Sequence, residues 1–294
     1  LTPRRAQSKS LVLRHPLISF FVLTYAIAWL LWAPLVIFRD RVPGPLGFVL
    51  ILLGSLVPST VGVVFVALLR GRSGVRTLLG RLLHARIGLR WYLAVVALTM
   101  LAPLAVGMSI LMGGDTPVVD NTLFGILFLF AFMIFPGSAL GEELGWRGFV
   151  LPRMQARHSA LKASLLIGIL WGPWHVPLWL TGSEGHPISL YVPFVVAVVA
   201  SSVFYTWLYN NTGGSLLIVV LYHAASNLPI TVLITSLGSQ MAQPFLIYVV
   251  LTVVAAVIVV IVTGAENLSR AAHRQIERPD VTDEIDPSLA ESQH

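Results

Sequence analysis

Eight long apolar stretches constrain this chain more than any other feature of its sequence. Each reaches the length of about 20 residues that an α-helix needs to cross the hydrocarbon core of a bilayer. They lie at approximately 17–38, 46–69, 91–113, 122–140, 163–181, 188–209, 215–236 and 244–263. The sequence therefore predicts an all-α, multi-pass membrane protein with about eight transmembrane helices. We expect the fourth of them to continue as helix past residue 140.

Composition supports this interpretation. Apolar residues make up 56% of the 294 residues and charged residues 11%, whereas a soluble domain carries about a quarter charged residues. A soluble chain of this length could not bury so much apolar surface, so membrane lipid is its expected surrounding. The chain has no cysteine, which excludes disulfides, thiolate metal ligands and a cysteine nucleophile.

The basic residues predict the orientation. Seventeen of the 19 lysines and arginines flank the apolar stretches on one side, and only Arg39 and Arg41 fall on the other. Cytoplasmic loops carry such an excess, so we expect both termini to lie in the cytoplasm. The segment 72–90 alternates arginine with leucine at helical spacing and is expected to lie along the inner leaflet. Since no basic stripe is separate from the helix flanks, a nucleic-acid partner is not expected.

Two regions differ in composition. Residues 1–264 contain all the apolar stretches and are interpreted as one integral membrane domain. Residues 265–294 are polar, with an acidic cluster and prolines, and are expected to form a flexible cytoplasmic tail.

Ionisable side chains at membrane depth are costly and usually functional, and three polar clusters interrupt the apolar pattern. The first contains Glu142, Glu143 and Arg147. On a helix, Glu143 and Arg147 are four residues apart and can pair, while Glu142 points about 100° away from Glu143. One carboxylate could then have a structural role while the other faces a cavity as a general base. The alternative is a helix end with ordinary surface charges.

The second cluster places His175 well inside an apolar stretch, between Pro173 and Pro177. Prolines bend or break a helix, and broken helices at membrane depth are tolerated where they line a cavity. We expect this break, together with Gly213 and Gly214, to shape a cavity open to the cytoplasm.

The third cluster contains His223 and Asn227, which are four residues apart and share one helix face. Both side chains can donate hydrogen bonds to a developing oxyanion. The alternative is a polar pair that only holds two helices together.

Taken together, the order of these motifs resembles the CPBP family, the CAAX-protease and bacteriocin-processing group also called ABI. Its pattern is EExxxR, then an aromatic residue four before a histidine, then HxxxN, and here it spans roughly residues 120–235. This family includes the prenyl-protein endopeptidases that remove the last three residues of a CAAX protein. Its second motif usually has phenylalanine where this chain has Trp171, a difference that we expect to alter packing rather than chemistry.

The resemblance implies a role for each matching residue. Glu142 and His175 would activate the attacking water, and His223 and Asn227 would stabilise the oxyanion. Glu143 and Arg147, as supporting residues, would hold the site in shape.

The implied reaction is hydrolysis of a peptide bond in a membrane-associated peptide or protein. The chain has no Gly-x-Ser-x-Gly elbow, so water is the expected nucleophile. Because the family has been labelled metalloprotease, Glu142, His175 and His223 could instead form a two-histidine, one-carboxylate zinc set. We favour the version without a cofactor, because a carboxylate–histidine pair can activate water without a cation.

Two other functions fit the same polar residues. They could line a proton-coupled transport route, or the chain could be a membrane scaffold without catalytic activity. Transporters usually show internal repeats, and the sequence shows none. The preference for arginine over lysine suggests a GC-rich bacterial genome, and hence a bacterial inner-membrane location and a substrate without a prenyl group.

Overall fold

The computed structural model describes residues 11–119, 122–181 and 187–270, and helices are the only regular secondary structure in these ranges. As the apolar stretches predict, eight helical segments of the described chain are long and apolar enough to cross a membrane. They are Pro16–Phe38, Gly44–Leu83, Leu89–Leu111, Leu123–Gln155, Ala160–Thr181, Ile188–Asn211, Leu216–Leu233 and Ala242–Thr263.

Several of these spans contain more than one helix. The α-helices are α1 (Leu11–Arg14), α2 (Pro16–Phe38), α3 (Gly44–Ser55), α4 (Val57–Gly80), α5 (Leu89–Thr99), α6 (Leu101–Leu111), α7 (Leu123–Ile134), α8 (Ser138–Glu143), α9 (Leu151–Gln155), α10 (Ala160–Trp174), α11 (Val176–Thr181), α12 (Tyr191–Asn211), α13 (Leu216–Leu237) and α14 (Ala242–Thr263). Short 3₁₀ turns are η1 (Arg39–Arg41), η2 (Arg81–Leu83), η4 (Ile188–Leu190) and η5 (Gly238–Met241), and η3 (Leu144–Val150) is a π-helix.

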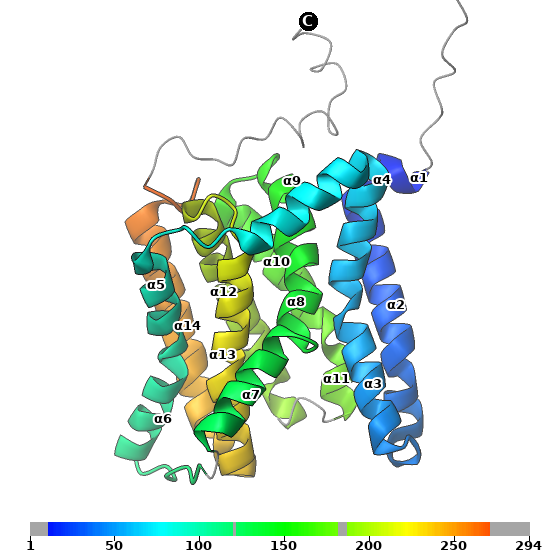
Figure 1. Cartoon of the computed structure of the whole chain (residues 1–294). Helices are drawn as coiled ribbons and strands as arrows, with labels where there is room; N and C mark the ends of the chain where they lie inside the picture. Colours follow the sequence, from blue (N-terminus) through cyan, green and yellow to red (C-terminus); the bar gives the residue numbers. More distant parts are fainter. Residues whose placement is uncertain (1–10, 120–121, 182–186, 271–294) are drawn as a thin grey trace, which may run out of the picture.

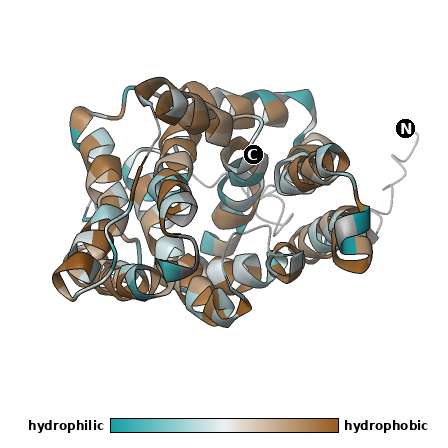
Figure 2. Ribbon diagram, turned by 90° about the horizontal axis from the view of Figure 1, so that it is seen from below, coloured by the Kyte–Doolittle hydropathy of each residue, from teal (hydrophilic) through white to brown (hydrophobic). Residues whose placement is uncertain are grey.

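The spans stand side by side as one bundle (Figure 1). Large apolar side chains such as Leu30, Leu111 and Phe124 are 73%, 88% and 79% exposed on its outside. Hydrophobic residues colour most turns of the helices when the bundle is viewed from below (Figure 2). An outer surface of this kind is stable in lipid and not in water, so the chain is a multi-pass membrane protein.

The second span bends sharply near its basic end. Gly71, with φ of 62°, interrupts the helical backbone of α4, and the part that follows lies across the top of the bundle (Figure 1). Leu78 of this part is buried while Arg72 and Arg76 are exposed. The amphipathic surface helix expected over 72–90 is therefore present, although it ends in a 3₁₀ turn at Leu83.

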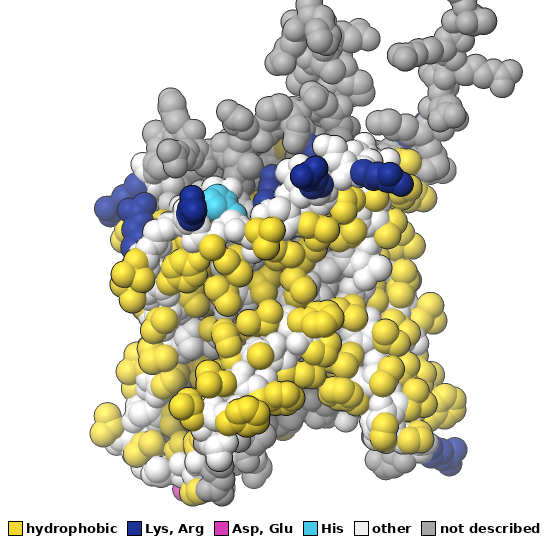
Figure 3. Space-filling view, viewed as in Figure 1, with side chains coloured by type: hydrophobic (Ala, Val, Ile, Leu, Met, Phe, Trp, Pro, Cys, Tyr) yellow, Lys and Arg dark blue, Asp and Glu magenta, His cyan; other side chains and the backbone are white. Residues whose placement is uncertain are grey.

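Lysine and arginine side chains gather along the upper edge of the bundle (Figure 3). The predicted separation of charge between the two ends is thus visible among the described residues. Placement of the upper edge in the cytoplasm stays a prediction, and Arg4, Arg5, Lys9, Arg274 and Arg278 lie outside the described residues.

Helix α4 approaches the π-helix η3 closely. A Cβ atom added to Gly145 would lie 2.3 Å from the carbonyl oxygen of Pro58, and one added to Gly62 would lie 2.9 Å from the Cα of Gly145. Small residues allow this kind of backbone contact between membrane helices. The contact fixes the position, along the axis of the bundle, of the segment that carries the glutamate pair.

A cluster of aromatic rings supports the other side of this segment. Trp146 makes edge contacts with Phe20 and Trp174, with ring centroids 5.4 and 6.0 Å apart, and Phe149 stacks on Phe20 at 5.3 Å. Trp146, Phe20 and Phe149 are fully buried. Rings packed in this way restrict motion of η3, which follows the glutamate pair directly.

The start of the expected polar tail is folded, which corrects our prediction of a flexible segment over 265–294. The side-chain amides of Asn210 and Asn211 donate to the carbonyls of Asn267 and Leu268, both at 2.8 Å, and the side chain of Leu268 is fully buried. Composition could not predict this anchoring, because it depends on asparagines at the end of a distant helix. Residues 271–294 lie outside the described residues, and the prediction stands there untested.

Candidate active site

The glutamate pair lies at the end of α8, after a break in the fourth span between Ile134 and Ser138. The continuous helix expected past residue 140 is therefore interrupted. The hydroxyl of Ser59 enters the helix beyond the break: it donates to the carbonyl of Leu140 at 2.8 Å and accepts from the N–H of Leu144 at 3.2 Å. A side chain inserted in this way replaces the usual helical bond and favours the wider π-helix that follows.

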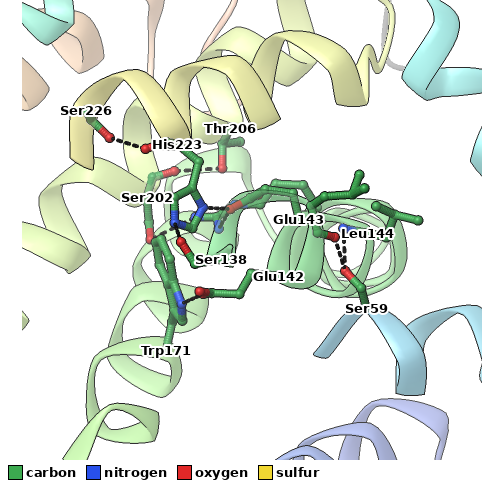
Figure 4. Close-up of polar contacts among 12 residues, drawn as sticks. Ser59, Ser138, Glu142, Glu143, Leu144, Trp171, Ser202, Thr206, His223 and Ser226 are labelled. Carbon is green, nitrogen blue, oxygen red and sulfur yellow. Dashed lines mark hydrogen bonds and ion pairs between the residues drawn. The ribbon is translucent and has the colours of Figure 1, made fainter. Parts of the chain in front are cut away.

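The side chain of Glu143 is completely buried, and two side chains contact its carboxylate. Its Oε1 lies 3.0 Å from Arg147 Nη1, so the ion pair expected from their spacing is present. The same oxygen lies 2.7 Å from Nδ1 of His223, on a helix 80 positions later in the chain (Figure 4). This second contact was not expected from the sequence.

Arg147 is sandwiched between two aromatic rings. Its guanidinium carbon lies 4.4 Å from the ring centre of Trp171 and 3.8 Å from that of Tyr205. Such cation–π contacts stabilise a buried guanidinium by about 1–2 kcal/mol beyond its ion pair. The ion pair of Arg147 and Glu143 is therefore fixed from several sides, and its role as the supporting pair stays a prediction.

Glu142 points away from this pair, as the helical rotation predicts. Its side chain is 2% exposed, and its Oε2 accepts a hydrogen bond of 2.6 Å from the indole Nε1 of Trp171 (Figure 4). A phenylalanine could not donate this bond. Tryptophan at this position therefore adds a polar contact to the difference in packing that we expected, and whether it alters the chemistry stays untested.

His175 lies at the helix break that the prolines predict. Helix α10 ends at Trp174, and the backbone N–H of His175 bonds to the carbonyl of Gly172 in a tighter turn. This leaves the carbonyl of Trp171 free to accept from Nδ1 of His175, at 3.0 Å. Since Nδ1 must carry the proton to donate, the neutral ring keeps Nε2 as its base.

His223 and Asn227 lie on one face of α13, as their spacing predicts. Nε2 of His223 is 3.3 Å from the hydroxyl of Ser138, at the start of α8. Asn227 lines the same cavity as Glu142, His175 and His223. Both members of the predicted polar pair thus face the same cavity.

The cavity has a volume of about 540 Å³ and takes its wall from α3, α7, α8, α10, α11, α12, α13 and α14. A cavity beside the proline break was expected, and it is present. Its wall extends through Phe48, Leu178 and Phe245, which lie toward the ends of their spans away from the arginine-rich edge. We expected the cavity to extend toward the arginine-rich edge, which is the side predicted to face the cytoplasm. The break at Pro173 lies in that far half of its span, whereas Gly213 and Gly214 do not contribute to the wall.

The possible zinc set was tested against this arrangement. Within the described part of the chain, no group of three or more histidine and acidic side chains is placed to hold one metal ion. Glu142, His175 and His223 share the cavity but do not converge in the way that tetrahedral zinc coordination needs. These three side chains, as arranged here, do not fit a tetrahedral zinc ion.

All six residues singled out in the sequence come together around this cavity or directly behind it. Sequence reasoning missed Ser59 and Ser138, which contact the site across 85 residues of chain. Serine is common in membrane helices, so nothing in its local pattern indicated a role. The motif predicted an aromatic ring at Trp171 but not the hydrogen bond of its indole nitrogen.

Comparison with known proteins bears on the same part of the chain. The family model described as type II CAAX prenyl endopeptidase Rce1-like matches residues 123–229, close to the motif region of about 120–235. A protein from Methanococcus maripaludis named CAAX prenyl protease 2 is 24% identical over 222 residues. That similarity covers 71% of this chain and 82% of the archaeal protein. Both findings indicate a peptidase, in agreement with the motifs.

Proposed function

Because this chain belongs to the CPBP family of CAAX-protease-like membrane proteins, we propose that it is an intramembrane endopeptidase acting through Glu142 and His175. One observation carries the proposal: a buried carboxylate, two histidines and an asparagine line one cavity at membrane depth. Hydrolysis of a peptide bond needs a base, a proton shuttle and an oxyanion site, and these side chains can supply all three.

The proposed reaction begins with a water molecule beside Glu142. The carboxylate accepts a proton as the water oxygen attacks the carbonyl carbon of the substrate, and the carbonyl π electrons move to its oxygen. Nε2 of His175 can accept a hydrogen bond from the same water molecule and so helps to orient it. The proton then passes to the amide nitrogen as the C–N bond breaks, which gives a new carboxyl group and a new amine.

The oxyanion formed in the first step needs donors. The side-chain amide of Asn227 can donate, and Nε2 of His223 can donate when it carries a proton in addition to Nδ1. Glu143 fixes the imidazole from behind through Nδ1, at 2.7 Å. Arg147 holds Glu143 in turn, so the chain of contacts aims His223 at the cavity.

The proposed substrate is a membrane-associated peptide or protein, and the proposed location is the cell membrane, the inner membrane if the source is bacterial. The test is product analysis by mass spectrometry on a panel of prenylated CAAX peptides and unprenylated membrane peptides. We expect the wild-type protein to cleave at least one, and His175→Ala to lose cleavage while remaining folded. Undiminished cleavage by His175→Ala would contradict the role of this residue.

Two further arms separate the alternatives. If a strong chelator abolishes cleavage and zinc restores it, the reaction is metal-dependent. If the wild-type protein cleaves nothing on the panel but moves protons across proteoliposomes when a solute is added, the site belongs to a transporter. A scaffold would show neither activity, and substitution of Glu142 would leave its binding to partner proteins unchanged.

A further inference from the structure

Trp171 contacts the site in more ways than any pattern in the sequence suggested. Its indole N–H donates to Glu142 Oε2 over 2.6 Å, which is short for an N–H···O bond. A buried carboxylate is costly unless donors satisfy it. The oxygen that receives this bond therefore has a defined position in the site.

The indole cannot turn away from this contact. One face of its ring lies against the guanidinium of Arg147, and Tyr205 meets it edge to face with ring centroids 5.5 Å apart. The side chain is 5% exposed. Neighbours on both sides therefore determine where the N–H points.

The backbone of the same residue holds His175. The carbonyl of Trp171 accepts from Nδ1 of His175, one helical turn further along the chain. The ring of His223 also lies edge-on to the indole, at 5.6 Å. One residue thus contacts both side chains that we propose to activate water, and it does so through two different groups.

We propose that Trp171 is a positioning residue that holds the carboxylate of Glu142 toward the cavity through its indole N–H, an inference that rests on the proposed function. The backbone contact to His175 would exist with any residue at this position, and the ring contacts would exist with phenylalanine. The N–H is the one element that requires tryptophan.

Trp171→Phe isolates that element. It keeps an aromatic ring for Arg147 and the carbonyl for His175, and it removes the donor to Glu142. We expect kcat to fall by about 10- to 100-fold with little change in KM, because a lost donor and a displaced base affect the transition state more than substrate binding. We also expect the acidic limb of the pH–rate profile to move to higher pH, because the ionised carboxylate loses a stabilising donor.

Trp91→Phe serves as the matched control. Trp91 is 8% exposed, close to the 5% of Trp171, and it packs on Trp207 at the basic end of the bundle, away from the cavity. It should lose a similar packing volume and leave both kcat and the pH profile unchanged. If removal of any buried indole lowered activity in general, kcat would fall to a similar extent in both variants.

A second readout does not depend on turnover. In protein labelled with ¹⁵N at tryptophan, the Nε1–H resonance of Trp171 is expected far downfield, and Glu142→Ala should shift it toward the other indoles. If the wild-type protein cleaves peptides but Trp171→Phe has unchanged kcat and pH profile, the positioning role is wrong. If no peptide is cleaved but the resonance behaves as expected, the contact is real and the proposed function has failed. An unshifted resonance in Glu142→Ala would overturn the contact itself.

Discussion

The ion pair behind the site allows a quantitative test. Glu143 and Arg147 are 0% and 1% exposed, and their charged atoms are 3.0 Å apart. Removing one partner leaves the other charge buried, which costs about 3–5 kcal/mol of unfolding free energy in comparable pairs. We therefore expect Glu143→Gln and Arg147→Met each to destabilise the protein by about this amount.

The double variant is the decisive member of the series. It contains neither charge, so we expect it to lose about 2–3 kcal/mol less than the sum of the two single losses. Unfolding can be followed by tryptophan fluorescence as SDS is added to mixed micelles. Arg81→Met combined with Glu143→Gln is the control, since Arg81 bonds to Tyr209 instead, and those losses should add within about 0.5 kcal/mol. Additive losses for the Glu143 and Arg147 changes would refute the buried pair.

Three other predictions follow from the packing and the charge distribution. Gly145→Ala places a methyl group 2.3 Å from the Pro58 carbonyl, so it should push α4 away, lower thermal stability and reduce cleavage by about 10- to 100-fold; wild-type stability in a thermal melt would contradict the close approach. Asn211→Ala removes the bond to the Leu268 carbonyl, so limited proteolysis should cut after residue 263 sooner than in wild type, and an unchanged rate would count against the anchoring. Tags at the two termini should both be accessible from the cytoplasmic side in intact cells, and opposite accessibility would reverse the topology derived from the basic residues.

The transmembrane architecture could be predicted because it depends on local properties. A span requires a minimum length of apolar sequence, and the eight predicted stretches fall on the eight helical segments of the described chain. Six of them agree within a few residues at both ends, whereas the second and fourth segments continue to Leu83 and Gln155, well beyond the predicted ends at 69 and 140. The surface helix was equally local, since the alternation of Leu78 with its neighbouring arginines defines a face. The sharp bend at Gly71 was not predicted, because glycine is also tolerated within membrane helices.

The site was predictable to the extent that its residues were unusual for their surroundings. Glu142 and His175 drew attention because ionisable groups are rare at membrane depth, and Glu143 and Arg147 could be paired from their spacing. Contacts between distant segments were not accessible in this way. Ser59 joins the glutamate segment only because α4 packs against it, and no periodicity encodes that register.

Trp171 shows a different limit. Its ring fitted the aromatic position of the motif, and the indole nitrogen was overlooked because a hydrogen bond needs a partner whose position the sequence does not give. The partner, Glu142, lies 29 residues earlier on another span. The same reasoning failed for the tail near Leu268, where polar composition suggested flexibility although asparagines at a helix end hold the backbone.

Glu142→Gln tests the central claim most directly. Glutamine is nearly isosteric with glutamate and retains an oxygen to accept from Trp171, so the fold and the cavity should be preserved, as thermal unfolding would verify. It cannot accept a proton from water. With a peptide that the wild-type protein cleaves, we expect the rate to fall by about 10²- to 10⁴-fold, as loss of a general base does. A folded Glu142→Gln protein that cleaves at the wild-type rate would contradict the account.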